Sequence, residues 1–273
     1  MPGGLAGAIL VEMDRAGVLA LLRRADETAD LPRLGGMARA DGVVIASERF
    51  WAFARRDGSI QEGTMPSPPS ITRRIPLVRG LLRLGLAMAP LFRGSNVARP
   101  RERLFLAAAV IAPFSLVFLP QSAALPLAIT LGVLLLAWML RGRTLFLHGA
   151  EHRAIAAAES GSLVATWDDV ARPSRFSPRC GTNFAALVLP VSVGADHLWP
   201  LPVAAYTPFV VTLISLALTM ELWQVVQTSR HRVAQVFLFP GLALQRLTTL
   251  EPSVDETQVA LSAVASVLKR ELA

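Results

Sequence analysis

Two histidines and a glutamate, in the stretch from 147 to 153, are the residues of this sequence best suited to chemistry. His148 and His152 are four residues apart, so on a helix they share one face, and Glu151 lies beside them. Two imidazoles at this spacing can hold one metal ion, and a neighbouring carboxylate can bind it or take a proton from water. The order His-x-x-Glu-His is that of an inverted zinc-protease motif. The stretch therefore predicts a metal site.

Cys180 is the third candidate ligand and the only cysteine of the 273 residues, so an intrachain disulfide is excluded. It is either a small buried apolar side chain or a thiolate ligand. We expect His148, His152 and Cys180 to bind zinc or another divalent metal, since imidazole and thiolate suit zinc best, with iron as an alternative. Glu151 is then the expected catalytic general base. In the competing interpretation, the histidines are interfacial groups bonded to carbonyls and lipid phosphates.

Composition favours a membrane protein. Of the residues, 53% are hydrophobic and 17% are charged, against about 25% charged in soluble domains, and the mean hydropathy is +0.48. The net charge of +7 rests almost entirely on arginine, and no arginine run is interleaved with exposed aromatic residues. Nucleic acid is therefore not an expected partner. The expected partner is the lipid bilayer, with other membrane protein subunits as a further candidate.

Four apolar segments predict a mostly α membrane protein with two transmembrane helical hairpins, 104–119 with 123–140 and 184–199 with 203–223. The hairpin tips contain proline and lack lysine and arginine, whereas the flanking loops are rich in arginine. By the positive-inside rule, these loops and both termini face the cytoplasm, in a bacterial inner (plasma) membrane. Short β-favouring runs and an Asp-Gly turn predict a small N-terminal β-hairpin region, an antiparallel sheet at about 41–62.

The predicted domain organisation has six parts, and it places the His/Glu/Cys cluster at the inner membrane surface. The parts are an N-terminal cytoplasmic region with the small antiparallel sheet (1–70), an interfacial amphipathic helix and basic loop (71–103), the first membrane hairpin (104–140), a cytoplasmic helical insert with the cluster (141–183), the second membrane hairpin (184–223), and a C-terminal cytoplasmic segment with an amphipathic helix (224–273).

Three stretches together resemble the YqhQ-like bacterial membrane family, domain of unknown function 1385. They are His-Gly-Ala-Glu-His at 148–152, Pro-Arg-Cys-Gly-Thr at 178–182, and Pro-Gly-Leu-Ala-Leu-Gln-Arg-Leu-Thr-Thr at 240–249. Residues 35–43 are similar to its glycine-rich N-terminal motif, although Met37 and Asp41 replace the usual Gln and Glu. The resemblance covers most of the chain from about residue 35 and implies a metal-dependent enzyme. The family typically has a histidine where Ser177 stands, which leaves either an open three-ligand site or a site that has lost its metal.

Three functions stay open from the sequence. The first is a metal-dependent hydrolase at the cytoplasmic membrane face, acting on a lipid, a peptide or another amphiphile. The second is a non-catalytic structural or accessory subunit of a larger membrane protein complex with a degenerate metal site; short, proline-broken hairpins fit it, because such helices often complete their packing against a partner. The third is a haem or chlorin binder that uses His148 or His152. A covalent c-type haem is excluded, since the sequence has no Cys-x-x-Cys-His.

Overall fold

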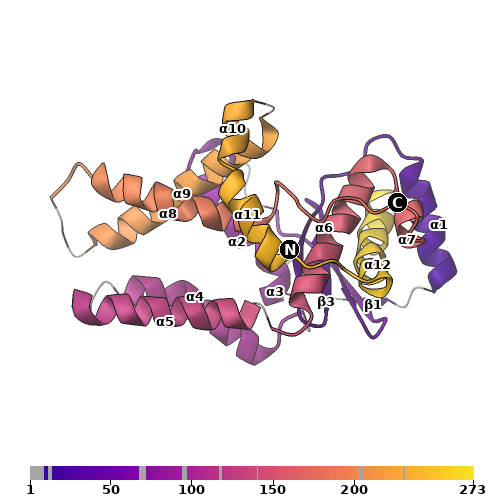
Figure 1. Ribbon diagram of the computed structural model, residues 1–273, viewed down its shortest axis with the longest axis horizontal. Coiled ribbons are helices and arrows are strands. Elements are labelled where there is room, and N and C mark those ends of the chain that lie inside the picture. The colour runs from indigo at the N-terminus through magenta and orange to yellow at the C-terminus, as the bar shows by residue number, and fades with distance from the viewer. Residues whose placement is uncertain are drawn as a thin grey trace, which may run out of the picture.

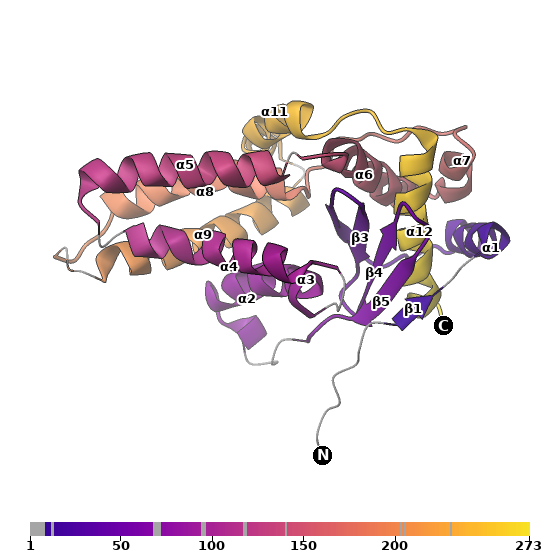
Figure 2. The same ribbon diagram turned by 90° about the horizontal axis from the view of Figure 1, so that it is seen from below.

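The structure is a computed structural model that describes residues 9–11, 14–67, 72–93, 97–116, 119–139, 141–202, 204, 206–229 and 231–273. It combines an α+β part with an elongated helical arm. In both views the four long helices of the arm, Pro100–Leu116, Gln121–Met139, Gly181–His197 and Thr207–Thr228, extend away from the sheet in the same direction (Figures 1 and 2). The candidate site lies where these two parts meet, so the fold is described from the sheet outward.

The described strands form one antiparallel sheet in the order β1-β5-β4-β3-β2. The strands are β1 (Ile9–Val11), β2 (Gly35–Ala38), β3 (Gly42–Ala46), β4 (Phe50–Arg55) and β5 (Ile60–Thr64). β3 and β4 match the β-branched and aromatic runs of the sequence, and Val44 pairs with Phe53 in their register. The turn from β4 to β5 uses Gly58 at φ +86°, and Asp57 Oδ1 accepts the Ser59 N–H at 2.9 Å. The predicted Asp-Gly turn is confirmed.

Four helices complete the α+β part: α1 (Arg15–Asp26), α6 (Thr144–Ser160), α7 (Leu163–Trp167) and α12 (Val254–Glu271). α12 packs on β3, β4 and β5 and also on α6, α1 and α7. It begins with a capping box in which Ser253 and Glu256 exchange side-chain and backbone hydrogen bonds. The alanine-rich run from 260 to 268 is almost wholly buried, so α12 is a central core helix of this part.

The arm contains the apolar helices. Its elements are a 3₁₀ turn (Thr72–Arg74), α2 (Val78–Ala87), α3 (Ala89–Arg93), α4 (Pro100–Leu116), α5 (Gln121–Met139), α8 (Gly181–His197), α9 (Thr207–Thr228), α10 (Arg232–Val236) and α11 (Phe239–Thr248). α4 packs against α5, and α8 packs against α9. In addition, α2 packs on α9 and α11 packs on α8. Arg79 of α2 forms an ion pair with Glu221 of α9, which ties these two helices together.

The predicted fold class, a membrane protein with two transmembrane hairpins, is wrong. Within the described residues, only Thr207–Gln227 of α9 is a helix long and apolar enough to cross a membrane. α4 and α8 have 17 residues each, about 26 Å of helix against a hydrocarbon core of about 30 Å. The predicted small β-hairpin region is a larger sheet that shares one core with α6 and α12. Hydropathy registers the apolar side chains of these segments but not the lengths of the helices that they form, which is why the prediction failed.

Candidate metal centre

Helix α6 carries both histidines and is held against the segment that follows α11. Gly149 faces the Leu250 carbonyl so closely that a Cβ at this position would lie 2.1 Å from the oxygen. The Leu250 N–H in turn donates to the Leu145 carbonyl at 3.0 Å. Only glycine permits this approach of two backbones, and it places the C-terminal end of α11 beside His148.

His148, His152 and Cys180 converge on one point. One ligand atom from each lies within 4.8 Å of those of the other two, and His148 Nε2 is 3.2 Å from Cys180 Sγ. The two rings meet edge to face, with centroids 4.5 Å apart. Cys180 is the N-cap of α8, and its sulfur also accepts from the Thr182 hydroxyl at 3.2 Å. The structure thus brings together the three residues that the sequence proposed as ligands.

The hydrogen bonds of both rings leave Nε2 as the ligand atom. Nδ1 of His148 lies 2.8 Å from the Thr248 carbonyl oxygen, and Nδ1 of His152 lies 2.6 Å from that of Arg175. A carbonyl can only accept, so each Nδ1 carries the proton and each Nε2 keeps its lone pair. Nε2 of His152 is buried and has no hydrogen-bond partner within the described residues. A buried polar atom of this kind needs a partner, and a metal ion would supply one.

Burial sets the charge of the three side chains. It lowers the pKa of His148, and together with the nearby His148 it lowers the pKa of His152 to about 4. Both rings are therefore neutral at pH 7, as metal ligands must be. Burial, with a contribution from Glu151, raises the pKa of the Cys180 thiol to about 11. A metal ion would have to displace the thiol proton, as it does in other thiolate sites.

Glu151 points toward the sheet edge and is not part of the ligand group. Burial raises its pKa to about 8, against a hydrogen bond with the backbone of Ala38 that lowers it. Its side chain lies over Gly36, where an added Cβ would come within 2.7 Å of Glu151 Cγ. This contact explains the glycine in β2: a side chain at that position would occupy the space of the carboxyl group.

Helix α11 holds the turn that carries Cys180 in place through hydrogen bonds. Gln245 accepts the Ser177 N–H through Oε1 and donates to the Ser177 carbonyl through Nε2, both at 2.8 Å. Asn183 also donates to the Ser177 carbonyl, at 2.9 Å, and Gly241 is the residue that leaves room for Asn183. The Ser177 hydroxyl accepts the Arg179 N–H at 3.2 Å, so it supports the turn. Hydroxyl groups are not among the usual zinc ligands, so Ser177 is not a candidate ligand.

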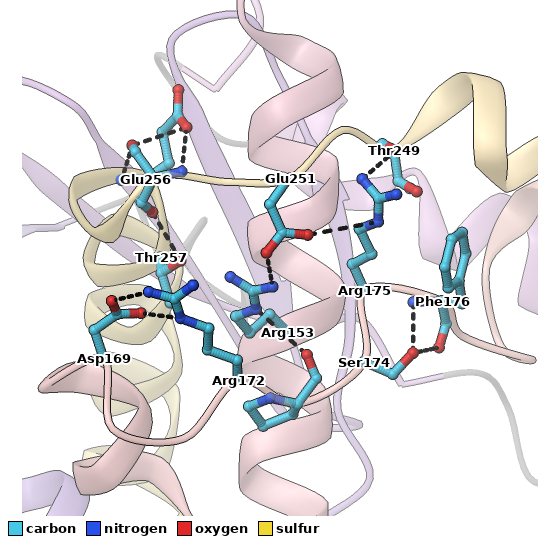
Figure 3. A network of polar contacts seen from close by, with 12 residues as sticks. Arg153, Asp169, Arg172, Ser174, Arg175, Phe176, Thr249, Glu251, Glu256 and Thr257 are labelled. Carbon is cyan, nitrogen blue, oxygen red and sulfur yellow. Dashed lines mark hydrogen bonds and ion pairs between the residues drawn. The ribbon is translucent and has the colours of Figure 1, made fainter.

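An arginine network fixes the segment whose carbonyl accepts from His152 (Figure 3). Glu251 forms ion pairs with Arg153 and, at 3.7 Å, with Arg175. Arg175 also donates to the Thr249 carbonyl at 3.3 Å, and Arg153 donates to the Pro173 carbonyl at 3.3 Å. The contacts join α6, the turn before Cys180 and the end of α11. The backbone of Arg175 is thereby held in place for His152.

Sequence reasoning missed the residues that orient the ligands, namely Arg175, Gln245 and Thr248. Two of them act through backbone carbonyls, which residue type does not reveal. The one available signal was the recognisable stretch at 240–249, whose role could not be derived from its residues. The structure supplies that role: this stretch holds both His148 and the Cys180 turn.

Comparison with known proteins agrees with these motifs. The family model described as "Protein of unknown function (DUF1385)" matches residues 113–270. The chain is 26% identical to the uncharacterized protein YqhQ of Bacillus subtilis (strain 168), over 88% of this chain and 93% of that protein. No solved structure matches the fold.

Proposed function

The chain belongs to the DUF1385 family of proteins of unknown function, and we propose that it binds one divalent metal ion, with zinc the best fit. The observation that carries the proposal is the buried, unpartnered Nε2 of His152, which converges with His148 Nε2 and Cys180 Sγ. Imidazole and thiolate groups both bind zinc, and three protein ligands with an open fourth position are the pattern of catalytic zinc sites. The carbonyl groups that accept from both Nδ1 atoms act as the outer shell of such a site.

For the reaction, we propose metal-dependent hydrolysis of an amphiphile such as a lipid or a peptide. A bound metal would polarise the scissile group and acidify a water molecule. Glu151 would hold and release a proton, since its pKa of about 8 is close to neutral pH. Glu151 lies close enough to the ligand group for its charge to raise the pKa of the Cys180 thiol, which supports this role.

Elemental analysis of the gently solubilised protein tests the metal site. We expect about one metal ion per chain, and loss of that ion in His152→Ala. His197→Ala is the matched control, because His197 is an exposed histidine at the far end of α8. Equal metal content in wild type and His152→Ala would exclude the site.

Hydrolysis is tested separately with Glu151→Gln. We expect this variant to keep its metal and to lose activity against ester, amide and phosphoester amphiphiles. Unchanged activity would remove Glu151 from the mechanism while leaving metal binding intact.

We further propose the lipid bilayer as a partner, in the bacterial inner membrane. The support is the apolar α9 and the exposed apolar side chains on the arm, among them Ile129, Leu189 and Tyr206. Fractionation of cells tests this, with the protein expected in the membrane pellet and released by detergent but not by high salt. Recovery in the soluble fraction would contradict it. The orientation of the termini stays a prediction.

One observation favours a second function, that of an accessory subunit with a structural metal. His152 is 2% exposed and Cys180 is 8% exposed, and closed sites are typical of structural zinc. In that case Glu151→Gln would behave as wild type, the protein would co-purify with fixed membrane partners, and removal of the metal would unfold it.

A further inference from the structure

A cleft of about 580 Å³ lies at the base of α4, at the edge of the α+β part. Its walls are formed by the turn after β2, the turn after β4, and residues 97–100 at the start of α4. None of its lining residues belongs to the candidate metal centre, so whatever it binds is independent of the proposed function.

The lining of the cleft is rich in arginine. It includes Arg39, Arg55, Arg56 and Arg99 against two carboxylates, Asp41 and Asp57. The carboxylate of Asp41 lies 3.7 Å from Arg39 Nε and 3.9 Å from Arg55 Nε. Asp57 Oδ1 accepts both the N–H and the hydroxyl of Ser59, at 2.9 and 2.6 Å. Both carboxylates therefore already have partners within the two turns.

Two of the guanidinium groups have no acidic partner. In the described parts of the chain, neither Arg56 nor Arg99 takes part in an ion pair, and both side chains are exposed. The cleft thus keeps a positive surplus that a ligand could neutralise.

Arg39 supplies a second, independent observation. It lines the cleft, its side chain is 9% exposed, and Glu102 engages its Nη2. Its Nε is buried and finds no hydrogen-bond partner among the described residues, because Asp41 lies beyond hydrogen-bond distance. Leaving a buried charged donor without an acceptor is costly, which favours an external acceptor at this position.

We propose that this cleft binds a phosphate-bearing anion through Arg39, Arg56 and Arg99. Guanidinium groups match phosphate oxygens with paired, charge-assisted hydrogen bonds. The same phosphate chemistry occurs in soluble phosphate compounds and in phospholipid headgroups. Titration with each source distinguishes them.

The test uses the full-length protein and two probes. Inorganic phosphate is titrated by calorimetry, and vesicles of phosphatidylglycerol and phosphatidylcholine in equal parts are assayed by co-sedimentation. Arg56→Gln and Arg99→Gln each remove one unpaired guanidinium from the rim and are not expected to disturb the fold, which circular dichroism checks. Arg15→Gln, an exposed arginine at the start of α1, is the matched control.

We expect each rim variant to weaken binding about ten-fold, with Arg15→Gln unchanged. An effect on phosphate titration identifies a soluble ligand, and an effect on vesicle binding alone identifies a lipid headgroup; both support the cleft. The proposal is overturned if neither probe binds the wild type, or if both rim variants bind both probes as well as the wild type does.

Discussion

The backbone carbonyl of Thr248 accepts a hydrogen bond from His148 Nδ1 at 2.8 Å, across 100 residues of sequence. This bond selects the tautomer that leaves His148 Nε2 facing Cys180. The end of α11 therefore acts as the outer shell of the candidate metal centre. Disturbing α11 should weaken the metal site without removing a ligand.

Gln245→Ala tests this most directly. Gln245 is fully buried and makes two hydrogen bonds with the backbone of Ser177. Its removal leaves the partly buried N–H and carbonyl of Ser177 with fewer partners, so we expect a loss of about 1–3 kcal/mol in the free energy of unfolding. Metal affinity should fall about 10- to 100-fold, because the turn that carries Cys180 loosens. Chemical denaturation and competition with a zinc chelator measure the two effects.

Gly241→Ala should disturb a second contact between α11 and the start of α8, that of Gly241 with Asn183. An added Cβ would lie 2.1 Å from Asn183 Oδ1 and 2.5 Å from Asn183 Cα. The second contact is with backbone, so relieving it requires the backbone of Asn183 to move. We expect a destabilisation of about 1–3 kcal/mol, measured by thermal unfolding. Gly194→Ala in α8 is the control, since nothing lies within 4 Å of its added Cβ, and it should be neutral or slightly stabilising. Equal effects of the two substitutions would mean that α11 does not pack on Asn183 as described.

Glu102 predicts a pH dependence of stability. Burial alone would raise its pKa, but the backbone N–H of Arg99 and the guanidinium groups of Arg39 and Arg141 outweigh burial, so the pKa is lowered. The stabilisation is complete above the unfolded-state pKa, near 4.5, and is lost as the pH falls through the lower folded-state value.

Glu102→Gln should therefore be less stable than wild type by about 1–2 kcal/mol at pH 7, since Arg141 is partly exposed and the pairs are not fully buried. The difference should shrink as the pH falls below the folded-state pKa. Urea unfolding of both proteins from pH 7 to pH 3 measures it. A difference that stays constant over this range would show that the charge of Glu102 contributes nothing.

Part of this architecture could be predicted from sequence. The strands at β3 and β4 follow from β-branched and aromatic runs, and the spacing of His148 and His152 follows from helical periodicity. Cys180 was proposed as the third ligand only from its residue type and from a family resemblance. Its 3.2 Å approach to His148 depends on how α8 begins, which local sequence does not encode.

The rest depends on tertiary packing. The ion pair between Glu221 and Arg79 could not be predicted from the sequence, because it forms only where α2 packs on α9. The carbonyls of Thr248 and Arg175, which accept from the two Nδ1 atoms, could not be predicted from residue type, since every residue has a carbonyl. Hydropathy overstated the membrane content because it takes no account of helix length: α4 and α8, which hold two of the predicted spans, have only 17 residues each.

The pair Gly35 and Gly36 offers a sharp test of how Glu151 is positioned. An added Cβ on Gly36 would lie 2.7–2.9 Å from the Cγ, Oε1 and Cδ atoms of Glu151, whereas one on Gly35 meets nothing within 4 Å. Because Glu151 is buried and cannot swing into solvent, we expect Gly36→Ala to destabilise the protein by about 1–3 kcal/mol and Gly35→Ala to have little effect.

The double variant Gly36→Ala/Glu151→Ala separates this contact from a general effect on β2. Removing the carboxyl group makes room for the new methyl group, so the two substitutions should cost less together than the sum of their separate costs, by about 1 kcal/mol or more. Thermal unfolding of the four proteins measures this coupling. Strict additivity would place Glu151 away from Gly36 and would leave the proposed general base without the wall that holds it in position.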